Sequence, residues 1–310
     1  GTPIENNIED LWSLMNIVNP NYLGSRMNFI DSYGSSNTND STLGNLKKKV
    51  SPFILRRVKS DVLKELPDKV EKIIYCELND KERTIYNNLL LQGKELIGSF
   101  FDSKKTQNES MEVLTLLLRL RQACCDLNLF AAPIDNTFVS SKVCLLEPII
   151  KNAINQGGKI IVFSQFVKML NIIERHLDSI DISSLLLHGG ISSKDRNRLV
   201  NSFQDPNNNT PVFLVSLKAG GYGLNLTAAD TVIHFDPWWN PSVENQATDR
   251  VHRIGQCKVV NCFKFIASNT VEEKILSLQQ KKMNLIDMSI DEDRPVMSGL
   301  TKDDLNFVLT

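Results

Sequence analysis

The feature that most constrains the fold is an alternation that runs from about residue 142 to residue 267. Short apolar runs, rich in β-branched and aromatic residues and bounded by turn residues, are typical of buried strands. Helical patterns separate most of them, although one gap is glycine-rich. The alternation predicts an α/β fold in which helices cover both faces of a parallel sheet. The expected strands are "KIIVFS", "SSLLLHG", "PVFLVS", "DTVIHFD" and "VVNCFKFIA", and the expected helices are "FVKMLNIIERHL", "SKDRNRLVNSFQ" and "SVENQATDRVHRI".

The N-terminal residues predict a small helical subdomain over about residues 5–66. Apolar residues recur at helical spacing from Asn6 or Asn7 to Val18. Residues 34–45 are polar and contain glycine, so we expect a loop there. Further along, "DKVEKIIYCEL" has a strand-like core.

The next segment predicts helices again. Asn79 or Asp80 can cap a helix that follows the "DKVEKIIYCEL" strand. A leucine-rich helix is expected over residues 111–125, followed by a loop over residues 126–141.

Composition excludes several classes of protein. A hydrophobic content of 42% over 310 residues supports a sizeable core. The 35 basic and 36 acidic residues indicate no bulk attraction to nucleic acid, although a local basic groove stays open. No apolar run approaches the roughly 18 residues of a membrane span, so we expect no membrane partner. The six cysteines form no Cys-x-x-Cys pair and are interpreted as buried, reduced thiols of an intracellular protein; no metal site is expected.

Polar residues follow the predicted strands where each strand ends. The carboxyl ends of parallel strands meet at one sheet edge, so these residues would gather there. Glycine, hydroxyl, amide and basic groups hold phosphate through backbone N–H groups and charge. An ordinary tight turn remains the alternative for the glycine-rich stretch "KAGGYGLNL", and no dinucleotide motif is present.

The stretch "QATDRVHRIGQ" places Gln246, Arg250 and Arg253 at positions i, i+4 and i+7. We expect them on one face of a helix that stops near Gly255, with Asn240 as its N-cap. Two guanidinium groups so placed predict binding of an anion. A solvated helix face or an internal salt bridge is the alternative.

These motifs together resemble the C-terminal half of the Swi/Snf-type ATPases, helicase-like DNA translocases of superfamily two. The resemblance runs nearly end to end, and residues 81–140 match only loosely. Where many relatives read Cys-Cys-His-Pro, this chain has Asp126 and Leu127 after its two cysteines. The matching segments are "GTPIENNIEDLWSL", "SPFILRRVKSDVLKELP", "KIIVFSQF", "LLLHGGISSKDRNRLVNSFQ", "LVSLKAGGYGLNLTAADTVIHFDPWWNP" and "QATDRVHRIGQ".

The resemblance implies a motor of two RecA-like lobes, with ATP between them and double-stranded DNA across both. The chain would supply the end of a first-lobe linker and a helical subdomain over residues 1–66. It would supply the second RecA-like lobe over residues 67–290 and a brace segment over residues 291–310.

The resemblance also implies roles for individual residues. Arg250 and Arg253 would be arginine fingers that reach the ATP phosphates, with Gln246 nearby, and Trp239 would probe a DNA groove. Residues expected to couple nucleotide to DNA are Gly221, Gly223 and Asn225, and those expected to hold the DNA backbone are Ser164, Gln165, Gly189, Gly190, Lys218 and Ala219.

No G-x-x-x-x-G-K-[ST] loop occurs in the sequence. The nearest stretch, "QGGKI", has Ala153 where the first glycine belongs and Ile160 after the lysine. The "DEDR" stretch near the end has no phosphate loop upstream. ATP and Mg²⁺ are therefore expected to bind mainly to a first lobe that precedes this chain in a longer polypeptide. The chain alone is expected to lack ATPase activity.

Two other classes stay open: a catalytically inactive nucleic-acid-binding or scaffold module, and a strand-separating helicase. The expected partners are double-stranded DNA and the first RecA-like lobe of the same polypeptide. Nucleosomes or DNA-bound RNA polymerase are candidate cargoes. The expected location is intracellular, in the nucleus of a eukaryote or the cytoplasm and nucleoid of a bacterium.

Overall fold

The computed structural model describes residues 8–33, 40–54, 66–102, 107–130, 138–220, 223–288 and 307. The chain divides into two compact units. The first contains residues 1–64 and 280–303, and the second contains residues 65–279 and 304–310.

The first unit contains the helices α1 (Ile8–Val18), α2 (Arg26–Tyr33) and α3 (Asp40–Val50), with the 3₁₀ turn η1 (Ser51–Phe53) after α3. α1 confirms the expected first helix. The loop expected over 34–45 is wrong from residue 40, where α3 begins. Packing overrides the weak helix propensity of serine, threonine and glycine there, because α3 contributes two side chains to the unit's core. That core contains Leu11, Met15, Phe29, Leu46 and Val50.

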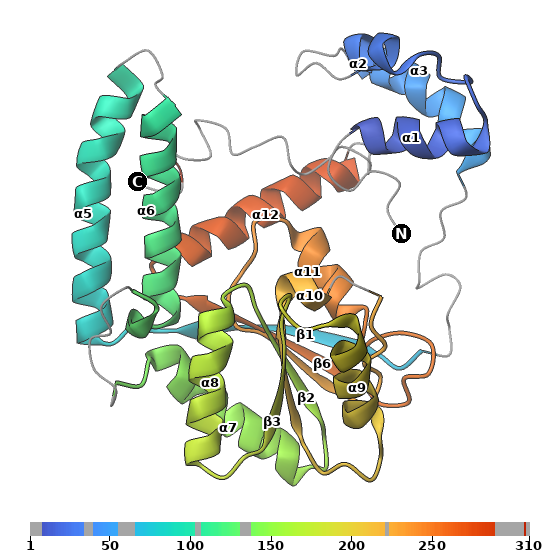
Figure 1. Ribbon diagram of the computed structural model, residues 1–310. Coiled ribbons are helices and arrows are strands. Elements are labelled where there is room, and N and C mark those ends of the chain that lie inside the picture. The colour runs from blue at the N-terminus through green and yellow to red at the C-terminus, as the bar shows by residue number, and fades with distance from the viewer. Residues whose placement is uncertain are drawn as a thin grey trace. The chain divides into compact units, whose positions relative to one another are not determined.

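The second unit is built on a parallel sheet (Figure 1). Its strand order is β1-β6-β5-β2-β4-β3, and every pairing is parallel. All the strands predicted from the apolar runs are confirmed, and the strand expected near residue 70 joins the sheet as β1. The strands are β1 (Lys69–Cys76), β2 (Ile160–Ser164), β3 (Ser184–Leu187), β4 (Val212–Ser216), β5 (Thr231–His234) and β6 (Val260–Ala267).

Helices cover both faces of this sheet, as predicted. Successive strand residues point to opposite faces, so Ile160 and Val162 of β2 join one core, and Ile161 and Phe163 join the other. Helices α7 (Ser141–Asn155) and α8 (Val167–Ser179) pack on the first core. Helices α9 (Ser193–Gln204) and α11 (Pro241–Thr248) pack on the second.

An antiparallel helix pair, α5 (Asp80–Asp102) and α6 (Gln107–Cys125), extends beyond the sheet (Figure 1). A Cβ at Gly93 of α5 would collide with Leu116 of α6, so glycine lets the helices approach closely. The Asn79 cap is confirmed: its Oδ1 accepts the N–H of Glu82, and the Glu82 carboxylate accepts the N–H of Asn79. The 3₁₀ turn η2 (Leu127–Leu129) follows α6, capped by Asp126.

A buried ion pair joins α7 to α12 (Val271–Met288). Lys142 Nζ lies 2.6 Å from Glu272 Oε2 and also donates to the carbonyl of Phe235 at 2.9 Å. Burial lowers the pKa of Lys142, but the attraction of Glu272 outweighs it and holds that pKa above its ordinary value. Burial raises the pKa of Glu272, while Lys142 acts in the opposite direction, so each group favours the charged form of the other inside the unit.

Cys76, Cys124, Cys125 and Cys262 are buried, as predicted, but Cys144 and Cys257 are exposed. The burial prediction is wrong for these two, since one lies on the outer face of α7 and the other in a turn before β6. Among the described helices, none combines the length and apolar character that crossing a bilayer requires.

Candidate nucleotide and DNA site

The polar strand ends meet at one edge of the sheet, as predicted. Ser164 at the end of β2 pairs with Ser216 at the end of β4, and Phe163 pairs with His234 at the end of β5. β3 ends at Leu187, which pairs with Val215, one residue before the end of β4. The carboxyl edge of β2, β3, β4 and β5 is therefore the place where the loops with candidate residues gather.

The residues predicted for DNA differ in exposure. Lys218, in the short helix α10 (Leu217–Gly220) after β4, is exposed, and so are Gly189 and Gly190 after β3. Gln165 and Trp239 are half-buried. Ser164 and Ala219 are buried. The Ser164 hydroxyl donates to Asp236 Oδ1 at 2.5 Å, and Ala219 belongs to a core cluster. These two side chains face inward, which leaves only their backbone for a contact at this edge.

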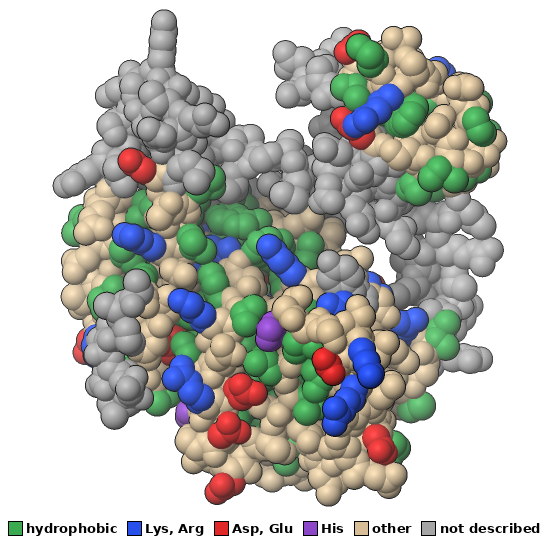
Figure 2. Space-filling model, in the orientation of Figure 1, with side chains coloured by type: hydrophobic (Ala, Val, Ile, Leu, Met, Phe, Trp, Pro, Cys, Tyr) green, Lys and Arg blue, Asp and Glu red, His purple; other side chains and the backbone are tan. Residues whose placement is uncertain are grey.

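Basic side chains also lie beside this edge. Helix α9, which follows the Gly189–Gly190 turn, carries Lys194, Arg196 and Arg198. Figure 2 shows basic side chains gathered over α9. Although the chain has a net charge of −1, this helix supplies a local positive surface of the kind that the composition left open.

The helical placement of the two arginines is wrong. α11 ends at Thr248, so Gln246 is helical, but Arg250 and Arg253 lie in the turns that follow. The backbone forms 3₁₀-type bonds there. The N–H of Arg250 bonds to the carbonyl of Ala247, and the N–H of Val251 bonds to the carbonyl of Thr248. The cause is tertiary, because the carbonyl of Arg250 accepts the N–H of Leu226 at 3.0 Å. The predicted Asn240 cap is confirmed by its bond to the N–H of Ser242.

These turns bring the arginines beside the loop predicted for nucleotide. Arg253 Nη1 donates to the carbonyl of Leu224 at 3.4 Å. Gly223 has φ +53°, a conformation that favours glycine, and the exposed Asn225 follows. The structure thus groups Gly223 and Asn225 with both arginines. Gln246 lies one turn before them on α11, and Gly221 lies outside the described residues.

Gln256 is a residue that the sequence analysis missed. Its buried Nε2 donates to the carbonyls of Ala229 (2.8 Å), Thr227 (3.2 Å) and Val251 (3.3 Å). Its Oε1 accepts the N–H groups of Cys257 and Lys258, each at 2.9 Å. A single side chain therefore ties the arginine turn to the loop after residue 223. A glutamine directly after Gly255, the expected helix stop, was the available signal, and that glycine has φ +99° in the structure.

Arg121 of α6 is a second residue that was missed. Its Nη1 donates to Gln165 Oε1 at 2.9 Å and its Nη2 to the carbonyl of Pro237 at 2.5 Å. Nη2 also lies 3.8 Å from Asp236 Oδ2. Burial raises the pKa of Asp236, while Arg121 acts in the opposite direction. An arginine on the leucine-rich face of α6, four residues after Leu117, was the available signal.

The turn that carries Trp238 and Trp239 is held from three helices. The N–H of Trp238 donates to Glu244 Oε1 of α11 at 2.7 Å, and its carbonyl accepts from Gln279 of α12. The Arg121 guanidinium of α6 lies 5.4 Å from the Trp238 ring and 5.5 Å from the Trp239 ring. The predicted groove-probing tryptophan therefore sits on a rigid support.

His234 is buried at the end of β5, where it bonds to the Thr248 hydroxyl at 2.8 Å and stacks on Phe163. Burial lowers the pKa of His234 to about 3, so its ring is neutral at physiological pH. It acts as a packed core residue. Within the described part of the chain, no group of three His, Cys, Asp or Glu side chains could hold a metal ion.

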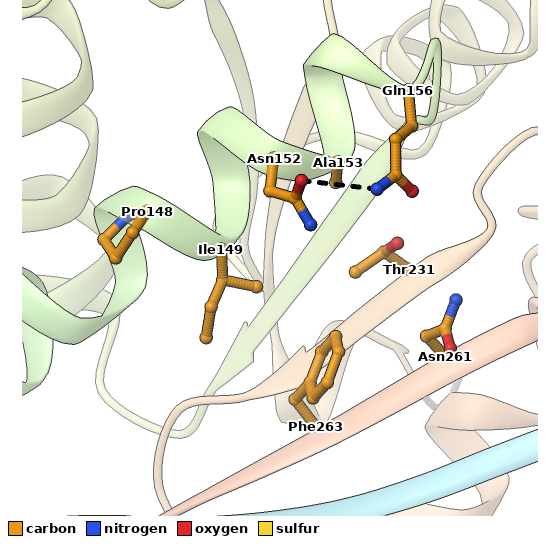
Figure 3. Close-up of a pocket in the computed structure, with 8 residues that line it drawn as sticks. All are labelled: Pro148, Ile149, Asn152, Ala153, Gln156, Thr231, Asn261 and Phe263. Atoms are coloured by element: carbon orange, nitrogen blue, oxygen red, sulfur yellow. Dashed lines mark hydrogen bonds between the residues drawn. The ribbon is translucent and has the colours of Figure 1, made fainter.

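A cavity of about 330 Å³ lies away from this edge (Figure 3). It sits between α7 and the residues at the start of β5 and β6, which are the amino ends of those strands. None of its lining residues belongs to the candidate site. They are Pro148, Ile149, Asn152, Ala153, Gln156, Thr231, Asn261 and Phe263.

Comparison with known proteins assigns the family. The SNF2-related domain matches residues 1–129, and the helicase conserved C-terminal domain matches residues 141–255. The solved C-terminal domain of the Sulfolobus solfataricus SWI2/SNF2 ATPase is 31% identical. The similarity covers 78% of this chain and 98% of that one, with a TM-score of 0.61. The chain belongs to the SWI2/SNF2 ATPase family, and its sheet has the RecA-like fold of that family.

Two further relatives extend the comparison. A Sulfolobus solfataricus SWI2/SNF2 ATPase core solved in complex with dsDNA is 35% identical over 99% of this chain and 65% of that one, with a TM-score of 0.63. An uncharacterized ATP-dependent helicase of Mycoplasma genitalium is 41% identical over 98% of this chain. The chain spans 29% of the length of that relative.

Proposed function

We propose that this chain is the second motor lobe of an ATP-driven double-stranded DNA translocase. One observation carries the proposal: a single sheet edge gathers the residues expected for DNA, and the loop beside it holds Gly223 and Asn225 next to both arginines. The solved relative that contains dsDNA supports duplex DNA as the partner. The Mycoplasma genitalium relative is named as an ATP-dependent helicase, which supports ATP as the energy source.

Arg250 and Arg253 fit the phosphates of ATP, since guanidinium groups only donate hydrogen bonds and are always charged. ATP would supply the transferring phosphoryl group, and the two arginines would stabilise the charge on its oxygens. Mg²⁺ does not fit in the same way, because the described residues offer no carboxylate cluster for it. We assign the metal and the phosphate loop to a first RecA-like lobe of the same polypeptide.

The first test is ATP hydrolysis by the purified chain. The sequence has no phosphate-binding loop, so we expect no hydrolysis above background, with or without duplex DNA. DNA-stimulated hydrolysis that Arg250→Ala abolishes would contradict this assignment. When the chain is fused behind a lobe that carries such a loop, hydrolysis should appear, and Arg250→Ala should lower its kcat by about 10³-fold or more.

The second test is binding of duplex DNA. Backbone contacts give sequence-independent binding that weakens with salt, so anisotropy titrations of two unrelated duplexes should give equal affinities and the same negative salt slope. Lys218→Ala should lower affinity for both and reduce the slope by about 1. A chain that binds neither duplex at low salt would overturn the DNA assignment.

A nucleic-acid-binding or scaffold module without catalysis is the second candidate. It would need the basic surface but not two arginines beside the loop of Gly223 and Asn225. In the fused enzyme, the scaffold reading predicts that Arg250→Ala and Arg253→Ala leave DNA binding and hydrolysis unchanged. Movement on DNA, measured by displacement of a triplex-forming strand, distinguishes a translocase. The cargo, nucleosomes or DNA-bound RNA polymerase, would be identified by repeating that assay with each as the obstacle.

A further inference from the structure

Arg121 has no part in the proposed function so far, yet it contacts that function's residues. It lies on α6, a helix that carries none of the predicted site residues, and its side chain is only 5% exposed. It reaches two candidate DNA residues: Gln165 through a hydrogen bond of 2.9 Å and Trp239 through its ring. The side chain of Arg121 is buried and contacts residues outside α6, so its role must be explained by those contacts.

The first consequence of Arg121 is the orientation of the Gln165 amide. A guanidinium can only donate, so it fixes the amide oxygen toward itself and turns Nε2 the other way. Gln165 Nε2 is buried and has no hydrogen-bond partner among the residues that the structure describes. An unpaired buried donor is unfavourable. Neighbouring atoms cover the donor, so an acceptor from outside reaches it only after those atoms shift, and phosphate oxygen is one that an N–H group binds well.

The second consequence concerns the tryptophan turn. Arg121 Nη2 donates to the carbonyl of Pro237 at 2.5 Å, directly before Trp238. The flat guanidinium also lies near the rings of Trp238 and Trp239. A planar guanidinium can donate hydrogen bonds from its edge while its faces stack on aromatic rings. The ammonium of lysine cannot do both.

A plain ion pair does not explain these contacts. The closest approach of Arg121 to Asp236 is 3.8 Å, longer than either of its hydrogen bonds to Gln165 and Pro237. Asp236 uses its oxygens mainly for the hydroxyl of Ser164 and the N–H of Gln165. If Arg121 only neutralised Asp236, a lysine would serve equally well.

We propose that Arg121 is a positioning residue for DNA binding. It fixes the Gln165 amide so that the unpaired Nε2 donor is left for a backbone phosphate once DNA displaces the atoms that cover it, and it holds Trp239 in place at the groove. The inference rests on the proposed function, since it needs duplex DNA at this sheet edge. The inference adds that α6, through Arg121, positions residues at the carboxyl edge of the sheet, although Arg121 itself does not contact DNA.

The experiment compares Arg121→Lys with Arg119→Lys in the 310-residue chain. Arg119 is exposed on the same helix, so the control makes the same change without disturbing the contacts. We expect Arg121→Lys to weaken binding of a labelled duplex by about 10-fold, and Arg119→Lys by less than about 2-fold. Gln165→Ala should cost about 10-fold alone and almost nothing further in the Arg121→Lys background, because the two residues act as a unit.

The outcomes separate the inference from the proposed function. If the unmodified chain fails to bind duplex DNA, the proposed function fails. If it binds and Arg121→Lys binds equally well, or if the effects of Arg121→Lys and Gln165→Ala simply add, the positioning role is overturned. A merely structural role would lower the melting temperature and leave the affinity of the folded protein unchanged.

A second measurement needs no DNA. With Trp12 replaced by Phe, the remaining fluorescence comes from Trp238 and Trp239. Arg121→Lys should increase acrylamide quenching of that fluorescence, and Arg119→Lys should not. Arg121→Met with Asp236→Asn removes both charges together, so no buried charge is left unpaired, and it should show the same increase. Unchanged quenching in both variants would overturn the proposal.

Discussion

Replacing Gln256 by Leu should release the arginine turn. Leucine keeps most of the volume but removes every hydrogen bond of the side chain. Three of these bonds are short: 2.8 Å to the carbonyl of Ala229, and 2.9 Å from the N–H groups of Cys257 and Lys258. At about 1 kcal/mol for each bond, the turn should lose about 3 kcal/mol of local stability.

Hydrogen exchange measures this loss directly. The amides of Cys257 and Lys258 should exchange about 100-fold faster in Gln256→Leu, since each tenfold corresponds to about 1.4 kcal/mol. The amide of Leu226, which bonds to the carbonyl of Arg250, should follow them. Gln156→Leu is the matched control, because Gln156 is exposed and lies elsewhere in the fold. Wild-type exchange at these three amides in Gln256→Leu would refute the reasoning.

Two further changes test the buried polar groups. Lys142→Met should destabilise the second unit by about 3–5 kcal/mol, because it leaves Glu272 buried without a counter-charge. Adding Glu272→Gln, which still accepts the N–H of Ala267, should restore part of that loss in urea unfolding. The pKa of His234 is about 3 in the folded chain, against about 6.5 when unfolded, so the unfolded chain binds the proton first as pH falls. The contribution of neutral His234 to the free energy of unfolding is therefore intact above about pH 6.5. It should shrink by about 1 kcal/mol between pH 7 and pH 5.5. That loss should be missing from the pH dependence of His234→Phe, and an identical pH dependence would contradict the burial argument.

The central strands of the second unit could be predicted from sequence because β2, β4 and β5 are short apolar runs that are buried on both faces. β2 is buried at all five positions, and so is β4. The length of such an apolar run and its β-branched and aromatic residues are enough to predict a buried strand. The gathering of the polar strand ends follows from parallel pairing, which the alternation with helices already implies.

Helix α7 was not predicted, although Val143, Leu146 and Ile150 are buried at helical spacing. Pro148 interrupts the pattern and favours a break. In the structure Pro148 is exposed, and so is Cys144, whose carbonyl loses its partner and can be hydrated. Burial of the opposite face then outweighs the missing hydrogen bond.

The placement of the arginines could not be predicted from local spacing. Positions i, i+4 and i+7 share a face only while a helix continues, and the bond from Leu226 to Arg250 ends this one. The Arg121 contacts were out of reach for the same reason, since Gln165 and Pro237 lie 44 and 116 residues further along the chain. Side chains joined over such separations depend on the finished fold.

The turn conformation changes what the two arginines can do. If the two arginines were part of α11, the helix would fix their positions relative to each other. Here Arg250 is fixed through its own carbonyl to Leu226, and Arg253 reaches the carbonyl of Leu224. Lys218, expected at the DNA backbone, lies only six residues before Leu224 in the chain. A shift of that loop on DNA binding would therefore act on both arginines through these two bonds. This arrangement gives a physical reason for hydrolysis in the fused enzyme to depend on DNA. It also implies that Gln256→Leu should weaken the stimulation by DNA more than the basal rate.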